Sequence, residues 1–182
     1  MTALRVARTV LVIQGLRALL YGFGSVLLGS LLAREGLSDV EAGAVFTSML
    51  VGMAIGSVVV ARWGDRLGQR RTYAVLFVLL AGAGTVFALT SWTPALVIAA
   101  LTGTISTDAN ESGPITSVEQ ALLSGVDPVT RTRVFGRYNA VAYFGGSIGA
   151  LAAGGPAALR SVLPSVPVDQ RFMLAFPMIG IA

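Results

Sequence analysis

The sequence predicts an all-α membrane protein, and two observations carry that prediction. Hydrophobic residues make up 54% of the 182 residues and charged residues only 12%, whereas about a quarter of the residues of a soluble domain are charged. The apolar residues also gather into runs of about the 20 residues that a helix needs to cross roughly 30 Å of hydrocarbon. This composition argues against a soluble domain, because such a surface cannot be solvated on all sides.

Three residue types that carry much of protein chemistry are absent, since the sequence contains no His, Cys or Lys. Disulfides, thiol chemistry and the usual zinc and haem ligands are therefore ruled out. No cofactor or metal is expected, and an intramembrane enzyme is disfavoured because it needs a nucleophile with a base, or a metal. The net charge of +4 comes from arginines placed between apolar runs, which favours membrane topology over nucleic-acid binding.

Five apolar runs are complete and a sixth has begun. The predicted spans are residues 9–33, 40–61, 72–90, 94–118, 135–155 and, incompletely, 172–182. Ser38 and Glu41 have the spacing of a capping box before the second span, and Pro94 marks a helix start before the fourth. Because about ten residues cannot cross a bilayer, we expect either a fragment of a longer chain or a truncated product.

Most of the arginines lie in every second connecting segment, as the positive-inside rule predicts. With the amino terminus in the cytoplasm, the cytoplasmic arginines are Arg5, Arg8, Arg62, Arg66, Arg70, Arg71, Arg131, Arg133 and Arg137, and the external ones are Arg34, Arg160 and Arg171. A signal peptide is disfavoured, because the first run is too long and contains Arg17. We therefore expect a multi-pass protein of the cell membrane, in contact with the lipid bilayer.

The segment between the second and third spans reads Ala61-Arg62-Trp63-Gly64-Asp65-Arg66-Leu67-Gly68-Gln69-Arg70-Arg71. Its glycines permit a tight reversal, and its acidic residue can cap a helix or pair with an arginine. An acidic residue followed by Arg, one residue, Gly and a basic pair resembles the signature loop of the major facilitator superfamily, from which Ala61 and Gln69 depart. The resemblance implies a gating loop made of Gly64, Asp65, Arg66, Gly68, Arg70 and Arg71.

The same resemblance implies a major-facilitator-type helix bundle. Residues 1–182 would form its amino-terminal transmembrane half, and the carboxy-terminal half of six helices would be a missing partner. It further implies a secondary active transporter, or permease, that moves a small-molecule substrate by alternating access. A proton is the expected coupling ion because titratable carboxylates are available, and symport and antiport both fit.

Two alternatives concern the function and the substrate. The chain could be a half-length membrane protein that does not transport by itself and acts as an assembly partner. Mixed charge in the expected cavity favours a zwitterion or a polar metabolite. The glycine-rich fifth span, similar to a helix of the antiporter branch, favours drug efflux instead.

An ionisable residue inside a span is costly and is therefore a functional candidate. Arg17 lies about 13 Å in from the cytoplasmic end of the first span, and Gln14 and Tyr21 continue its polar face. In the fourth span, Asp108 and Glu111 are expected to share one helical face, with Asp108 at the depth of Arg17. The predicted substrate and proton pathway pairs Arg17 with Asp108 or Glu111, although a permanent ion pair fits the pattern equally well.

Two further groups complete the predicted site. Glu119 is expected near the cytoplasmic end of the fourth span, as a brace that meets Arg66 or Arg133. Asn139 and Tyr143 form a polar face on the fifth span. They are either substrate contacts or partners in helix–helix hydrogen bonds, each worth about 1 kcal/mol.

Overall fold

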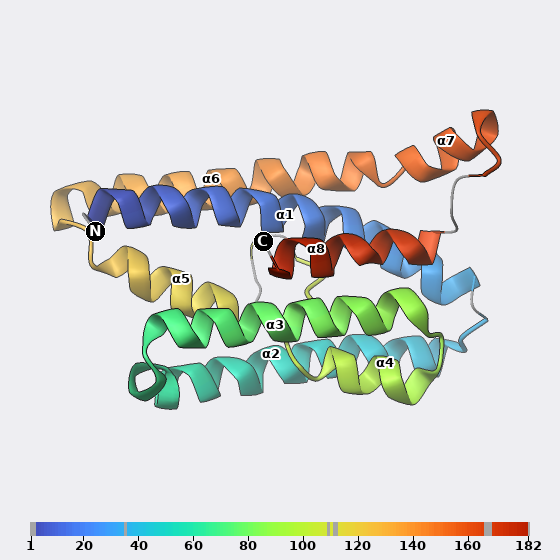
Figure 1. Cartoon of the computed structure of the whole chain (residues 1–182), viewed down its shortest axis with the longest axis horizontal. Coiled ribbons are helices and arrows are strands. Elements are labelled where there is room, and N and C mark those ends of the chain that lie inside the picture. Colours follow the sequence, from blue (N-terminus) through green and yellow to red (C-terminus); the bar gives the residue numbers. More distant parts are fainter. Residues whose placement is uncertain (1–2, 35, 109, 111–112, 166–168, 182) are drawn as a thin grey trace.

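The computed structural model describes residues 3–34, 36–108, 110, 113–165 and 169–181, and this part of the chain folds into helices and turns without a strand. Figure 1 shows the helices running roughly along the long axis of the molecule. Their bounds are α1 (Ala3–Arg34), α2 (Asp39–Leu67), α3 (Gln69–Leu89), α4 (Thr93–Ala100), α5 (Pro114–Ser124), α6 (Pro128–Ala152), α7 (Gly155–Val162), the 3₁₀ helix η1 (Asp169–Leu174) and α8 (Ala175–Ile181).

Two groups of helices make up the molecule. One group is α1 with α6, which pack along each other more extensively than any other pair, and the second is α2, α3 and α4. Helix α8 packs on α3, and α5 contacts both groups. Within the described residues, three helices are long and apolar enough to cross a membrane, namely Arg5–Arg34, Asp39–Leu67 and Gln69–Leu89. They cover the first three predicted spans.

The start of α2 has the predicted capping box. The Ser38 hydroxyl accepts a hydrogen bond from the Glu41 backbone N–H at 3.3 Å, and the Glu41 carboxylate accepts one from the Ser38 N–H at 2.9 Å. These bonds satisfy two donors that a helix start leaves without partners. The same carboxylate accepts a hydrogen bond from the Thr93 hydroxyl at 3.0 Å, which ties the start of α2 to the first residue of α4.

The turn between α2 and α3 is shorter than the sequence predicts. Only Gly68 separates the two helices, and its φ of 81° is one that glycine adopts at little cost. Gly64 was expected to take part in the reversal and Asp65 to cap a helix start. Both instead lie within α2, because the helix continues to Leu67 and the chain reverses at a single residue.

The fourth predicted span, residues 94–118, is the clearest correction, because the structure breaks it into α4 and α5. Gly103 and Gly113 have φ values of 65° and 51°, which do not belong to a right-handed helix. Between them, the Ser106 hydroxyl accepts from the Asp108 N–H at 3.0 Å, and the Asp108 carboxylate accepts from the Asn110 N–H at 2.8 Å. Such side-chain bonds to the backbone compete with helix formation.

The fifth and sixth predicted spans also differ in their bounds. The sequence predicted a helix over 135–155, whereas α6 begins at Pro128, after Asp127 accepts a hydrogen bond from the Val129 N–H at 3.1 Å. A short helix, α7, then follows where a loop was expected. Of the incomplete run 172–182, residues 172–181 form the end of η1 and then α8, and residue 182 lies outside the described residues.

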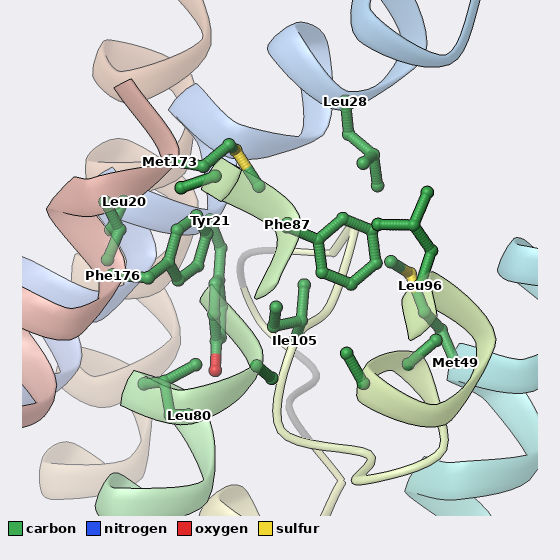
Figure 2. Close-up of a cluster of buried hydrophobic side chains, with 14 of the residues drawn as sticks. Leu20, Tyr21, Leu28, Met49, Leu80, Phe87, Leu96, Ile105, Met173 and Phe176 are labelled. Carbon is green, nitrogen blue, oxygen red and sulfur yellow. The ribbon is translucent and has the colours of Figure 1, made fainter. Parts of the chain in front are cut away.

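Close approach of backbones holds α1 against α6. A Cβ atom placed on Gly22 of α1 would overlap the backbone of Gly146 in α6, so a larger residue cannot fit there without moving a helix. Farther along, α1, α3 and α8 meet in the cluster of apolar side chains shown in Figure 2, where Phe176 lies beside Tyr21 with ring centroids 5.8 Å apart. Gly52 and Gly56 of α2, and Gly145 and Gly149 of α6, also lie against neighbouring elements.

We predict that Gly22→Ala destabilises the protein, whereas Gly29→Ala on the same helix does not. The added methyl group at Gly22 meets backbone atoms of α6, and overpacking of this kind costs about 1–3 kcal/mol. At Gly29 nothing lies within 4 Å, so alanine there should be neutral or slightly stabilising, because it favours helix. Thermal unfolding in detergent, followed by tryptophan fluorescence, measures both variants. Equal melting temperatures for the two would contradict this packing.

Candidate functional site

A buried ion pair joins α1 to α5. Arg17 Nη2 donates to Glu119 Oε2 at 2.5 Å, and both side chains are 0% exposed. The same guanidinium donates to Gln14 Oε1, one helical turn earlier in α1. Each of these side chains projects into the interior, because Gln14 and Arg17 lie on the buried face of α1 and Glu119 lies on the buried face of α5 with Ile115 and Val118.

Two tyrosines complete the surroundings of the Glu119 carboxylate. The Tyr138 hydroxyl of α6 donates to Oε2 at 2.6 Å, and the Tyr73 hydroxyl of α3 donates to Oε1 at 2.8 Å. The carboxylate therefore accepts hydrogen bonds from α1, α3 and α6 while it is itself carried by α5. Four helices therefore meet at this one group.

The energetics of burial explain why so many donors gather there. An isolated charge inside a protein costs several kcal/mol in lost hydration, and a partner at hydrogen-bond distance offsets that cost only when the remaining lone pairs are also satisfied. Both conditions hold for Glu119, since an arginine and two tyrosines donate to it. The cluster of Gln14, Arg17, Tyr73, Glu119 and Tyr138 is named here the Arg17–Glu119 cluster.

Tyr21 connects this cluster to the break between α4 and α5. Its ring lies 5.4 Å from the Arg17 guanidinium carbon, a distance suited to a cation–π contact. Its hydroxyl donates to the Thr104 carbonyl oxygen at 2.5 Å, inside the non-helical segment. A backbone acceptor that helix formation would have satisfied is thus bonded to a side chain from α1.

An open polar groove lies beside the break. Its volume is about 510 Å³, and its walls come from α1, α6 and the segment between α4 and α5. The lining residues are Gly22, Ser25, Thr107, Asp108, Tyr143, Gly146, Ser147 and Ala150. The facing ends of α4 and α5 lie near the middle of the long axis in Figure 1, and the segment between them supplies Thr107 and Asp108 to the groove.

The predicted gating loop lies at one end of the molecule. Nine arginines occupy the start of α1, the end of α2, the start of α3 and the start of α6, and Figure 1 shows these helix ends at the same end of the molecule. Gly64, Asp65 and Gln69 line a cavity of about 290 Å³ there with residues of α5. Arg66, Arg70 and Arg71 are exposed.

The structure corrects the predicted partner of Arg17. The expected pairing with Asp108 is not formed, since Arg17 pairs with Glu119 and Asp108 is exposed in the groove. Glu111, the other expected partner, lies outside the described residues. Glu119 was expected to brace Arg66 or Arg133, but it is buried with Arg17, because α5 turns its apolar face inward and Glu119 lies on that face.

Other predicted residues are dispersed. Tyr143 lines the groove, and its hydroxyl accepts a hydrogen bond from Asn110 Nδ2 at 3.2 Å. Asn139 lies on an exposed part of α6. Sequence reasoning missed Tyr73 and Tyr138, because a tyrosine is compatible with an ordinary interior. The signal that could have identified Glu119 is its spacing of three or four residues from apolar neighbours on α5.

Three comparisons place the chain among known proteins. Residues 10–166 match the model of the Major Facilitator Superfamily. The chain is also similar to the uncharacterized membrane protein YJR124C of Saccharomyces cerevisiae, with 26% identity over 140 residues, which are 76% of this chain and 31% of that protein. The chain thus spans less than a third of the length of this relative. No solved structure matches it.

We predict that the Arg17–Glu119 pair behaves as a coupled unit. Arg17→Met or Glu119→Gln alone should lower the free energy of unfolding by about 3–5 kcal/mol, because each leaves the other charge buried without its partner. The double variant should lose less than the sum of the two. Denaturant unfolding in mixed micelles measures the cycle.

The control for this cycle is Arg133→Met, which removes an exposed arginine from α6 and should change stability by no more than about 0.5 kcal/mol. Strictly additive losses for Arg17 and Glu119 would show that the pair contributes no coupling. Tyr73→Phe, which removes one donor to Glu119, should cost about 1 kcal/mol.

Proposed function

The chain belongs to the Major Facilitator Superfamily, and on this premise we propose that it is part of a proton-coupled secondary transporter that moves a small solute by alternating access. The observation that carries the proposal is the pair of sites at the centre of the helices. A buried ion pair, whose carboxylate accepts three hydrogen bonds, lies near an open polar groove. Tyr21 contacts Arg17 of the pair and the Thr104 carbonyl of the segment that supplies Thr107 and Asp108 to the groove. One site suits an ion and the other suits a solute.

The polar groove is the proposed solute site. It meets the α4–α5 break, and discontinuous helices supply many transporters with binding groups at the membrane midplane. Non-helical backbone at membrane depth is tolerated only where it is buried in protein or lines a wet cavity. The hydroxyl groups, the Asp108 carboxylate and the Tyr143 ring along its walls are groups that can bind a polar solute.

Glu119 is the proposed proton acceptor. In the pair, its negative charge balances Arg17, so a proton on the carboxylate removes the counter-charge that Glu119 supplies. Arg17 must then move or find another anion, for which Asp108 and Glu111 remain candidates. Any shift of Arg17 alters its contact with the Tyr21 ring, and Tyr21 is bonded to the Thr104 carbonyl. Protonation would thereby change the break that lines the solute groove.

We further propose that the chain forms the amino-terminal half of the transporter, with a six-helix carboxy-terminal half as its partner across the cavity. Two repeats that rock about a central site are the way such folds alternate access. The small share of the yeast relative that the chain covers supports this proposal. The second candidate, an assembly partner that does not transport by itself, fits the same helices. It predicts no solute movement in any combination of the chain with a carboxy-terminal half.

The proposed orientation has the amino terminus and the α2–α3 turn in the cytoplasm of a multi-pass protein of the cell membrane. Its support is the gathering of nine arginines at that end of the helices. The exposed residues Arg66, Arg70 and Arg71 around Gly68 form the proposed gate. Asp65 and Gln69, on either side of the turn, line a cavity with residues of α5.

We predict that an impermeant maleimide labels a cysteine in the α2–α3 turn only after the membrane is permeabilised. The natural chain has no cysteine, so single-cysteine variants are unambiguous. Gln69→Cys tests the turn, and Ser91→Cys, an exposed position between α3 and α4, is the matched control at the opposite end. Labelling of Gln69→Cys in intact cells would reverse the proposed topology.

We predict that Glu119→Gln abolishes proton coupling. Full-length protein is reconstituted in liposomes with a trapped pH-sensitive dye, and amines, amino acids and sugars are added outside. At least one solute should change the internal pH through the natural protein, and that change should be lost in Glu119→Gln because the amide cannot exchange a proton. Glu41→Gln is the control, since glutamine still serves a capping box. An unchanged proton flux in Glu119→Gln would remove Glu119 from the coupling mechanism.

A further inference from the structure

We infer that the groove binds a small organic cation, with the Asp108 carboxylate as its counter-ion and the Tyr143 ring against the rest of the molecule. The inference rests on the proposed function and deepens it by naming the chemical class of the solute. It follows from the charge that the groove presents, from its depth in the membrane and from the side chains around that charge.

The charge of the groove is negative. Among the described residues that line it, Asp108 is the one that carries a charge, and no described arginine forms an ion pair with this carboxylate. Arg17 is held by Glu119. Arg137 lies within α6 but forms no ion pair with a described carboxylate, and the other arginines lie toward the ends of the helices or in η1.

The position of this charge calls for a positive partner. A carboxylate in the membrane region is costly unless it faces a wet cavity and is neutralised by a cation or a proton. Asp108 accepts a hydrogen bond from the Asn110 N–H, which orients one of its oxygens but does not neutralise it. A cationic solute that enters the groove supplies the missing charge, whereas an anion would be repelled.

The rest of the groove suits an organic cation more than a metal ion. Tyr143 is 62% exposed and its hydroxyl is held by Asn110, so its ring is available and its orientation is fixed. An aromatic face attracts ammonium groups, and the attraction strengthens when water is excluded. The volume of about 510 Å³ is within the range of small-molecule sites. Gly22, Gly146 and Ala150 give the groove a partly apolar wall.

Three probes of nearly equal size and different charge test the inference, namely benzylamine, benzyl alcohol and benzoate. Binding to the full-length protein in detergent is measured by saturation-transfer NMR without any ion gradient. Benzylamine should bind at least tenfold more tightly than the other two. Asp108→Asn should abolish that preference, and Asp39→Asn, the same change at an exposed position at the start of α2, should leave it intact.

Two tyrosine variants separate the ring from its hydroxyl. Tyr143→Phe keeps the aromatic face and should retain most of the benzylamine affinity, whereas Tyr143→Leu should lose at least threefold. Equal binding of benzyl alcohol or benzoate, or an unchanged preference in Asp108→Asn, would overturn the inference. Those results leave the proposed function standing if another solute still moves protons through the natural protein. Loss of proton movement with every solute, while benzylamine binding persists, would instead overturn the proposed function alone.

Discussion

The neutralisation of Arg17 is the constraint on which the arrangement of these helices depends. A guanidinium with no exposed surface is tolerated only next to a counter-charge, and the counter-charge here is carried by a different helix. Because Tyr73 and Tyr138 donate to the same carboxylate, charge balance requires α1, α3, α5 and α6 to meet at one place. The ion pair therefore determines the positions of the helices as well as the charge of the interior.

The break between α4 and α5 is the second feature that determines the arrangement of the helices. Like the ion pair, it involves polar groups that need hydrogen-bond partners. A chain that leaves the helix at Gly103 loses backbone hydrogen bonds, and side chains replace some of them, as Tyr21 does for the Thr104 carbonyl. Polar backbone outside a helix has to find partners in protein or water, and Thr107 and Asp108 of this segment line the open groove. The groove is thus a physical consequence of the break, and both place Asp108 where a solute can reach it.

The sequence predicted the features that depend on local composition. It failed for the features that depend on contacts between residues far apart in the sequence. The lengths of the apolar runs predicted the helices, and Arg17 was identified as a candidate because its charge interrupts an apolar run. Its partner was predicted wrongly because the fourth span was treated as one continuous helix, which gave Asp108 a fixed phase relative to the residues after it. The positive φ at Gly113, between Asp108 and α5, removes that phase relation. Tyr138 could not be predicted, since its role arises only where α6 packs beside α1.

The two carboxylates at the centre are bonded in opposite ways, and this difference suits them to different tasks. Glu119 accepts hydrogen bonds from one arginine and two tyrosines, so a change of its protonation disturbs several helices together. Asp108 is open to a ligand but is joined through the break to Thr104, and so to Tyr21 and Arg17.

Coupling between two sites is reciprocal. If a proton on Glu119 weakens binding at Asp108 through Tyr21, a ligand at Asp108 must oppose protonation of Glu119 by the same free energy. A single neutral hydrogen bond contributes about 1 kcal/mol, so the Tyr21–Thr104 bond alone sets a coupling of less than about tenfold, and stronger coupling requires movement of the helices that the ion pair holds together.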